Sequence, residues 1–324
     1  MKNNFTYLIA GGAGFIGSHI CQRLLSDGNK VICIDNFITG SKKNIEPFLK
    51  NSNFSFIEHD IINPLPDIKE NIDTILHLAS PASPNKKSPR SYISYPIETL
   101  RVNSVGTYNL LELARENNSR FLYASTSEVY GDPAISPQPE TYFGNVNPNG
   151  IRSVYDEGKR FGEAICMAYF RKFNLDVRIA RIFNTYGDKM QKDDGRVVSN
   201  FINQALEQSP LTIFGDGSQT RSFCYVSDLV DGIVKMMEKD KIAGEVINIG
   251  NPVELTILEI ATLIKKLTGS RSEIVYEALP EDDPTKRKPD ITKAKTLLGF
   301  DPKVGVEAGI IKTIEYFRSN NEKI

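Results

Sequence analysis

Short apolar runs alternate with longer amphipathic stretches through the first half of the chain. Near-continuous apolar runs of this length are typical of strands buried on both faces of a parallel sheet. The stretches between them, such as residues 18–26 and 99–116, carry apolar positions at helical period. The pattern predicts β-α-β units with right-handed crossovers, and hence an α/β fold with a doubly wound parallel sheet of the Rossmann type. The predicted strands are residues 7–10, 31–34, 54–57, 74–78, 121–124 and 177–182.

The pattern loosens after about residue 185. A polar, glycine-bearing segment precedes a helical period at 197–208 and a strand-length run at 211–214. Residues 280–289 are polar and rich in proline, which is typical of a surface loop. The second half therefore does not simply continue the β-α-β pattern.

We predict two structural units. Residues 1–185 form the Rossmann domain, and segments near 222–260 return to it. The strand-like piece 245–250 and the helical piece 257–267 are the candidates for a return to the main sheet. Residues 186–324 otherwise form a smaller, discontinuous C-terminal lobe.

The composition narrows the class of protein. At 324 residues the chain exceeds the usual size of one compact core. Hydrophobic residues make up 40% and charged residues 24%, which is typical of a soluble globular enzyme. The formal net charge of -1 gives no basic surface for a nucleic acid, so no nucleic-acid partner is expected.

Neither a targeting segment nor a membrane span is expected. The first apolar run is too short for a signal sequence, and no run reaches the length of a span. The four cysteines form no CxxC pair and no cluster with the three histidines, so neither a metal site nor a disulfide framework is predicted. We expect a cytoplasmic protein with reduced thiols and no membrane partner.

A glycine-rich string, Gly11-Gly-Ala-Gly14-Phe15-Ile16-Gly17, follows the first predicted strand and opens the first predicted helix. This context predicts a dinucleotide-binding turn. Gly11 and Gly14 allow a tight turn and a close approach to a pyrophosphate, and Gly17 lets the helix pack against the strand. The helix N-terminus adds N–H donors and positive potential for the phosphates.

Asp35 ends the second predicted strand. A carboxylate there accepts the ribose hydroxyls and repels a 2′-phosphate, so it favours NAD over NADP, although Lys42 and Lys43 lie nearby. Asp60, at the end of the third strand, is a candidate adenine contact, with a solvated loop carboxylate as the alternative. The other predicted cofactor contacts in this half of the chain are Asn36, Ile61, Leu78, Ala79, Ser80 and Asn103.

Tyr155 and Lys159 lie four residues apart in a predicted helix. Residues at i and i+4 share a helix face, so an ammonium at Lys159 would lie beneath the phenol and lower its pKa from about 10 toward neutral pH. A hydroxyl-rich turn around Thr126 ends a predicted strand. Behind a dinucleotide turn these residues indicate hydride transfer, and an ordinary pair on a helix surface is the alternative.

These pieces resemble the extended short-chain dehydrogenase/reductase family, whose members act on nucleotide sugars, and the resemblance covers nearly the whole chain. It implies that Thr126 is the catalytic hydroxyl, Tyr155 the base and Lys159 its partner. It also implies that Tyr155 and Lys159 contact NAD.

Within this family the motifs resemble those of the UDP-glucuronate decarboxylases. At the position of Ser127 the dehydratases of this family carry an acidic residue. At the position of Glu128 the dehydratases also carry a glutamate, whereas the 4-epimerases do not. The resemblance implies oxidation of UDP-glucuronic acid at C4, loss of CO2 and re-reduction to UDP-xylose. A nucleotide-sugar 4,6-dehydratase or 4-epimerase on the same scaffold, and a catalytically silent NAD-binding sensor, are the alternatives. The matching motifs begin at His77, Ser125, Gly144, Tyr155, Arg181, Asp194, Gly217 and Asp283.

The resemblance also implies contacts with the UDP-sugar. Arg287 is expected to reach the reacting carboxylate and Arg221 to clamp the diphosphate, because a guanidinium suits such anions. Glu128 is expected beside the sugar ring as a catalytic residue. Asn184 is expected to contact the sugar or its phosphate, with a buried turn asparagine as the alternative. The remaining implied contacts are Pro84, Ser127, Val198 and Asn200.

Two further features bear on specificity and assembly. The loop 85–95 is several residues longer than the decarboxylase pattern, and its Lys86, Lys87 and Arg90 either recognise a carboxylate or are solvated. Helices at 97–116 and 154–173 carry apolar faces that relatives use to pair two subunits. A homodimer is therefore expected, and a face buried within one subunit is the alternative.

Overall fold

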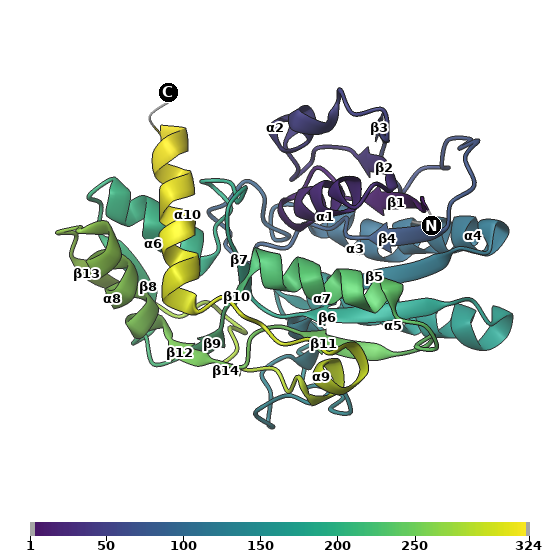
Figure 1. Cartoon of the computed structure of the whole chain (residues 1–324). Coiled ribbons are helices and arrows are strands. Elements are labelled where there is room, and N and C mark those ends of the chain that lie inside the picture. Colours follow the sequence, from purple (N-terminus) through teal and green to yellow (C-terminus); the bar gives the residue numbers. More distant parts are fainter. Residues whose placement is uncertain (1–3, 322–324) are drawn as a thin grey trace.

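The computed structural model describes residues 4–321 and confirms the predicted α/β fold. Residues 1–3 and 322–324, which belong to the two expected units, lie outside the described residues. A seven-stranded parallel sheet in the order β11-β6-β5-β4-β1-β2-β3 runs through the molecule, with helices on both faces (Figure 1). Its strands are β1 (Thr6–Ala10), β2 (Lys30–Asp35), β3 (Phe54–Glu58), β4 (Thr74–His77), β5 (Arg120–Thr126), β6 (Val177–Ile182) and β11 (Val246–Ile249).

The side chains of β1 explain why its apolar run is continuous. Leu8 and Ala10 pack with α4 and α5 on one face, and Tyr7 and Ile9 pack with α1 and α7 on the other. Because successive side chains of a strand point to opposite faces, a strand covered on both sides is apolar at every position. The covering helices are α1 (Phe15–Ser26), α4 (Thr107–Asn117), α5 (Ser153–Phe173) and α7 (Val226–Glu238).

The stretch predicted as one helix at 99–116 is interrupted. It consists of α3 (Pro96–Arg101), a π-helical segment η2 (Val102–Gly106) and then α4. The hydroxyls of Ser104 and Thr107 donate to carbonyls four residues earlier in the chain, and such bonds compete with the backbone ladder. The wider turn lies directly behind the cavity described below.

The second half builds three small sheets, of the order β10-β7, β12-β9-β14 and β13-β8. Strand β11 returns to the edge of the main sheet beside β6. The helical piece at 257–267 is α8 (Ile257–Thr268), but it packs on α6 (Val197–Leu206) and β8 (Leu211–Phe214) and does not return to the sheet as expected. Its buried face is built from isoleucines that join the apolar core of the smaller part of the molecule.

The remaining elements are short or lie towards the C-terminus. They are α2 (Lys42–Ile45), η1 (Glu46–Phe48), η3 (Ser127–Tyr130), β7 (Thr185–Tyr186), β9 (Thr220–Ser222), β10 (Cys224–Tyr225), β12 (Glu254–Thr256), β13 (Ile274–Glu277), β14 (Lys286–Arg287), α9 (Thr292–Leu298) and α10 (Val306–Asn321).

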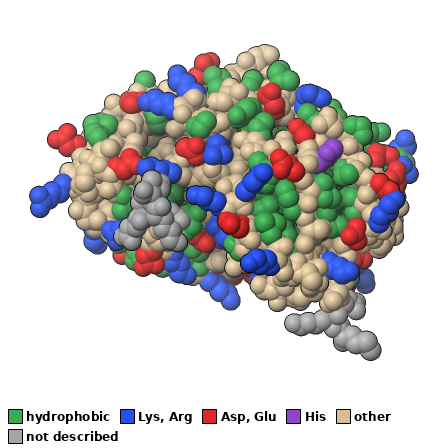
Figure 2. Space-filling model, turned by 90° about the horizontal axis from the view of Figure 1, so that it is seen from above, with side chains coloured by type: hydrophobic (Ala, Val, Ile, Leu, Met, Phe, Trp, Pro, Cys, Tyr) green, Lys and Arg blue, Asp and Glu red, His purple; other side chains and the backbone are tan. Residues whose placement is uncertain are grey.

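The surface carries mixed charge. Figure 2 shows Lys and Arg side chains interspersed with Asp and Glu across the face seen from above. Within residues 4–321, no helix has the length and apolarity needed to cross a membrane. In the same range, no three His, Cys, Asp or Glu side chains gather in a way that would hold a metal ion.

Candidate active site

A cavity of about 830 Å³ opens where the main sheet meets the smaller sheets. Ligands of doubly wound folds bind at the carboxyl ends of the strands, and the ends of β1, β2, β4 and β5 all contribute to it. Of the predicted site residues, Asn103 and Arg287 do not line it. Those that do are Gly11, Gly14, Phe15, Ile16, Gly17, Asp35, Asn36, Asp60, Ile61, Leu78, Ala79, Ser80, Pro84, Thr126, Ser127, Glu128, Tyr155, Lys159, Asn184, Val198, Asn200 and Arg221.

The glycine turn has room for backbone only. A Cβ on Gly11, whose φ is +83°, would lie 2.7 Å from the backbone nitrogen of Ala79. A Cβ on Gly17 would lie 2.2 Å from the carbonyl oxygen of Gly11. Helix α1 starts at Phe15 with Gly14 as its N-cap, so its first N–H groups face the cavity without a capping side chain. This cradle fits the pyrophosphate of a dinucleotide.

Replacing Gly17 with alanine is expected to lower NAD affinity at least about tenfold, because the new methyl group forces the turn away from the start of α1. Calorimetric titration of the variant with NAD measures this. Gly305→Ala is the matched control, since a Cβ there meets nothing within 4 Å. Equal NAD affinity in Gly17→Ala and Gly305→Ala would contradict the assignment of the turn.

Asp35 lies at the end of β2 and is buried. Its carboxylate accepts hydrogen bonds from the backbone N–H groups of Phe37 (2.8 Å) and Ala13 (3.0 Å). Burial raises the pKa of Asp35, and these two hydrogen bonds oppose that effect. Lys42 is ion-paired with Glu58 at 3.4 Å. The arrangement fits the ribose of NAD better than a 2′-phosphate.

Of two other predicted cofactor contacts, Asp60 lines the cavity and Asn103 does not. Asp60 lines the cavity, and its Oδ1 accepts the N–H of Ile62 at 3.1 Å. Asn103 is fully buried in η2 and does not reach the cavity, because its amide nitrogen donates to Ser80 Oγ at 2.9 Å. Asn103 therefore acts through Ser80, which itself lines the cavity.

Tyr155 and Thr126 lie together, and burial acts on the pKa of Tyr155 against the lowering expected from Lys159. Burial raises the pKa of Tyr155, and the nearby Thr126 hydroxyl lowers it in part. Lys159 Nζ lies 5.8 Å from the Tyr155 ring centroid and donates to the carbonyl oxygen of Ala124 at 2.8 Å. Burial lowers the pKa of Lys159 to about 7, so the amine is not the permanent ammonium that the helix spacing suggested.

The depressed pKa of Lys159 predicts a pH-dependent stability. Its unfolded value is 10.5, so charging the buried amine destabilises the fold by up to about 5 kcal/mol below pH 7, and this penalty disappears as the pH rises toward 10.5. Lys159→Met removes the penalty. The stability advantage of the variant over wild type, measured by urea unfolding, should therefore shrink between about pH 6 and about pH 10. An advantage independent of pH would contradict the burial of a titrating amine.

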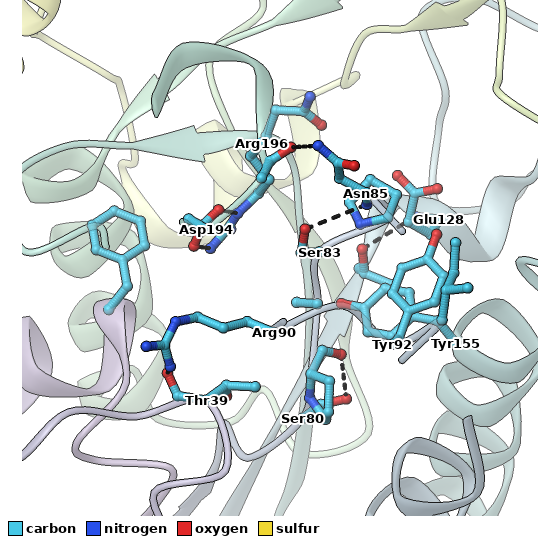
Figure 3. Close-up of a pocket in the computed structure, with 18 of the residues that line it drawn as sticks. Thr39, Ser80, Ser83, Asn85, Arg90, Tyr92, Glu128, Tyr155, Asp194 and Arg196 are labelled. Atoms are coloured by element: carbon cyan, nitrogen blue, oxygen red, sulfur yellow. Dashed lines mark hydrogen bonds and ion pairs between the residues drawn. The ribbon is translucent and has the colours of Figure 1, made fainter. Parts of the chain in front are cut away.

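Sequence reasoning missed Tyr92. Its ring is stacked on that of Tyr155, with centroids 4.9 Å apart and 4° between the planes (Figure 3). Among the residues that the structure describes, the buried Tyr92 hydroxyl has no hydrogen-bond partner, and Tyr92 lines the cavity. No local motif marks Tyr92, because the contact joins a long loop to a helix.

Glu128 is held between two guanidinium groups. Its Oε2 lies 2.5 Å from Arg152 Nη2 and 3.3 Å from Arg287 Nη2. Burial alone would raise the pKa of Glu128, but Arg287 and Arg152 outweigh it and hold the pKa at about 2. Glu128 is therefore ionised at neutral pH.

Arg287, the expected contact of the reacting carboxylate, lies in the short strand β14 and is not part of the cavity lining. It is 1% exposed, donates to the carbonyl oxygen of Ser127 and lies behind Glu128. Arg152, the other arginine paired with Glu128, does line the cavity. Arg152 comes three residues before Tyr155, and this spacing is the signal by which sequence reasoning could have found it.

The predicted substrate contacts of the smaller part also lie at the cavity. Arg221, in β9, forms an ion pair with Asp283 at 3.0 Å. Asn200 donates to the carbonyl oxygen of Gly195 at 3.0 Å, and the backbone carbonyl of Asn184 accepts the N–H of Cys224 at 2.8 Å. Pro84 and Val198 complete this side of the wall.

The long loop 85–95 crosses the rim of the cavity. Arg90 Nε lies 2.8 Å from Asp193 Oδ1. Its Nη1 donates to the carbonyl oxygen of Thr39 at 3.2 Å, and Figure 3 shows these two residues side by side. Lys87 is ion-paired with Glu277 at 3.1 Å. Lys86 also lines the cavity. Lys87 and Arg90 thus form ion pairs with Glu277 and Asp193 of the C-terminal half. The sequence predicted instead that these side chains either recognise a substrate carboxylate or are solvated.

The sequence profile of the NAD dependent epimerase/dehydratase family matches residues 7–250. The chain belongs to this family. The family resemblance predicted from the motifs and the dependence on NAD are thereby confirmed.

The similar proteins fall into two groups, which are curated relatives at about 50% sequence identity to this chain and solved structures at about 30%. UDP-glucuronic acid decarboxylase 1 of Danio rerio is 51% identical over all of this chain and 76% of its own length, and UDP-glucuronic acid decarboxylase 4 of Arabidopsis thaliana is 51% identical over 96% of this chain and 68% of its own. The UDP-glucuronic acid 4-epimerase of Bacillus cereus, solved with UDP-glucuronic acid and NAD, superimposes with a TM-score of 0.87 at 32% identity, over 98% of this chain and all of that one. The dTDP-glucose 4,6-dehydratase DesIV of Streptomyces venezuelae, solved with NAD, has a TM-score of 0.88 at 28% identity, over 98% of both chains. The fold is thus common to all of these activities, and the higher sequence identity is with decarboxylases.

Proposed function

We propose that this member of the epimerase/dehydratase family is an NAD-dependent UDP-glucuronate decarboxylase that converts UDP-glucuronic acid to UDP-xylose. The observation that carries the proposal is the 51% identity to decarboxylases over essentially the whole chain. The epimerase and dehydratase with the same fold are 32% and 28% identical. The alternatives on this scaffold are therefore less well supported.

The chemistry follows from the groups at the cavity. Bound NAD supplies a hydride acceptor for C4 of the sugar. Tyr155 would exchange a proton with the C4 hydroxyl; burial raises the pKa of its phenol, and the Thr126 hydroxyl opposes that rise. A sugar acid oxidised at C4 has its carboxylate β to a ketone, and it loses CO2 readily because the ketone accepts the electron pair. The protein then mainly positions groups and stabilises charge.

The charged groups beside Tyr155 have separate roles. Glu128 is ionised, so it acts as a base or a positioning anion and does not supply a proton from its resting state at neutral pH. Arg152 is the guanidinium that faces the cavity and is placed to meet the substrate carboxylate, while Arg287 acts from behind through Glu128. Arg221 serves the diphosphate, since a guanidinium pairs well with phosphate oxygens.

We also propose a two-unit division, with NAD in the Rossmann part and the UDP-sugar held by the smaller lobe, and a homodimer. The support for pairing is a set of exposed apolar side chains on neighbouring helices: Ile97 is 62% exposed in α3 and Phe161 is 49% exposed in α5. A cytoplasmic location is proposed because all four cysteines are free and buried, as is usual in reducing compartments.

Incubation of the purified protein with UDP-glucuronic acid, without added reductant, tests the proposed activity. Mass spectrometry and proton NMR should show loss of one CO2 and formation of UDP-xylose. An unchanged mass with an inverted C4 would indicate epimerisation instead. Loss of water from dTDP-glucose in a parallel reaction would indicate a dehydratase.

A further inference from the structure

Five charged side chains form a continuous series of ion pairs, of which all but Arg287 line the cavity: Arg287, Glu128, Arg152, Asp283 and Arg221. The successive N···O distances are 3.3, 2.5, 3.2 and 3.0 Å. Three guanidinium groups and two carboxylates leave one net positive charge. The series therefore suits an anionic ligand that carries charge at more than one point.

Asp283 is the link between Arg152 and Arg221 in the series. Its Oδ1 accepts from Arg152 Nη1 at 3.2 Å and its Oδ2 accepts from Arg221 Nη2 at 3.0 Å, so each carboxylate oxygen serves one arginine. The side chains of Arg152 and Arg221 are 7% and 10% exposed. Two buried cations close together repel each other, and a shared carboxylate offsets that repulsion.

The electrostatic environment of Arg221 agrees with this geometry. Burial lowers the pKa of Arg221, and the positive charges of Arg287 and Arg152 lower it further, whereas Asp283 raises it. Asp283 likewise raises the pKa of Arg152. The carboxylate therefore stabilises both guanidinium ions together.

The two arginines come from different parts of the fold. Arg152 immediately precedes α5, which carries Tyr155, and Arg221 lies in β9 of a small sheet. Asp283 lies in the loop before β14, and β14 pairs in parallel with β9 so that Arg287 is opposite Arg221. Asp283 is thus a direct polar connection between the start of the catalytic helix and the small sheet.

We propose that Asp283 is a positioning residue that couples the diphosphate end of the substrate site to its carboxylate end. The inference rests on the proposed function, in which Arg221 meets the diphosphate and Arg152 meets the reacting carboxylate. Through its two oxygens Asp283 fixes Arg152 relative to Arg221, so a diphosphate seated on Arg221 sets the distance at which Arg152 and Glu128 meet the sugar acid. Asp283 acts through these arginines and not on the reacting atoms.

The variant Asp283→Asn separates this role from simple anchoring. An amide offers one acceptor oxygen and one NH2 donor, so one arginine loses its partner and faces a donor. The cavity also gains positive charge, which favours an anion. We therefore expect kcat for UDP-glucuronic acid to fall at least tenfold, while the Kd for UDP, measured by calorimetry, stays within threefold of wild type or becomes tighter.

The adjacent residue provides the matched control. Asp282 is exposed, accepts from Asn147 Nδ2 at 3.1 Å and lies outside the ion-pair series. Its φ is +59°, a conformation that asparagine tolerates well. Asp282→Asn should therefore leave both kcat and the Kd for UDP unchanged.

Each outcome decides the proposal. A loss of UDP affinity in Asp283→Asn parallel to the loss of kcat would overturn it in favour of plain structural support, and unchanged kcat would overturn it outright. If Asp283→Asn does not fold, Asp283→Glu replaces it as the test, because glutamate keeps two acceptor oxygens at shifted positions. Asp283→Glu should lower kcat several-fold and retain the affinity for UDP. A wild-type kcat in Asp283→Glu would overturn the proposal. If the wild-type protein does not turn over UDP-glucuronic acid, the proposed function is overturned as well. If the wild type and Asp283→Asn are equally active, only the positioning role is overturned.

Discussion

Replacing Tyr155 with phenylalanine is expected to lower kcat about a thousandfold while leaving the fold intact. The phenol hydroxyl is the group placed to exchange a proton with the sugar, and such proton transfers contribute about 10²- to 10⁴-fold to a rate. The aromatic ring remains, so the stack on Tyr92 is preserved. Steady-state turnover of UDP-glucuronic acid, with thermal unfolding of the same sample, measures both parts of the expectation.

Tyr130→Phe is the matched control for this variant. Tyr130 is fully buried and does not line the cavity; its hydroxyl donates to Asn248 Oδ1 at 2.8 Å and accepts from Arg181 Nη1 at 3.0 Å. Loss of these two hydrogen bonds should cost about 2 kcal/mol of stability and change kcat by no more than a few-fold. Wild-type turnover in Tyr155→Phe would refute the assigned chemistry.

Replacing Arg287 with methionine is expected to damage both stability and activity. Glu128 would keep Arg152 as its partner but lose the second buried cation, and removal of one partner from a buried pair costs about 3–5 kcal/mol. Turnover should fall about 10²-fold, the effect of removing one preorganised donor near a reacting centre. Urea unfolding at pH 7 and the decarboxylation rate are the measurements.

The pH dependence of the same variant gives a second readout. The pKa of Glu128 lies at about 2 in the fold and at 4.5 when unfolded, so its stabilising contribution is complete above pH 4.5 and is lost as the pH falls toward 2. Arg287→Met raises the folded pKa, so the variant should lose less stability than wild type between pH 7 and pH 3. Lys286→Met, at the exposed neighbouring position, should match wild type in both assays. A variant at Arg287 that behaves like Lys286→Met would contradict the role of the buried cation.

The main sheet could be predicted because its information is local. Each strand covered on both faces is apolar at every position, as the two clusters on either side of β1 illustrate. The local sequence does not show which other element a helix packs against. The apolar face of Ile257, Ile260 and Ile264 predicts a helix, but the same face suits the main sheet or α6, and the structure has α6.

The candidate site divides in the same way. Tyr155 and Lys159 could be predicted to share a helix face because four residues separate them, but the pKa of Lys159 depends on burial, which no spacing encodes. Arg287 lies in a segment that is polar by sequence. It is buried because its partner Glu128, 159 positions earlier in the chain, holds it there. The ring stack of Tyr92 and the ion pairs of Asp283 could not be predicted for the same reason, since these contacts form only in the folded chain.

In the proposed reaction, C4 is oxidised and reduced again within one catalytic cycle while CO2 leaves C5. Turnover of UDP-glucuronic acid in D2O, followed by proton NMR of the product, tests it most directly. We expect UDP-xylose with one deuteron at C5 and the original hydrogen retained at C4, formed without added reductant. A product that keeps its carboxylate with C4 inverted, or UDP-xylose with deuterium at C4, would contradict it.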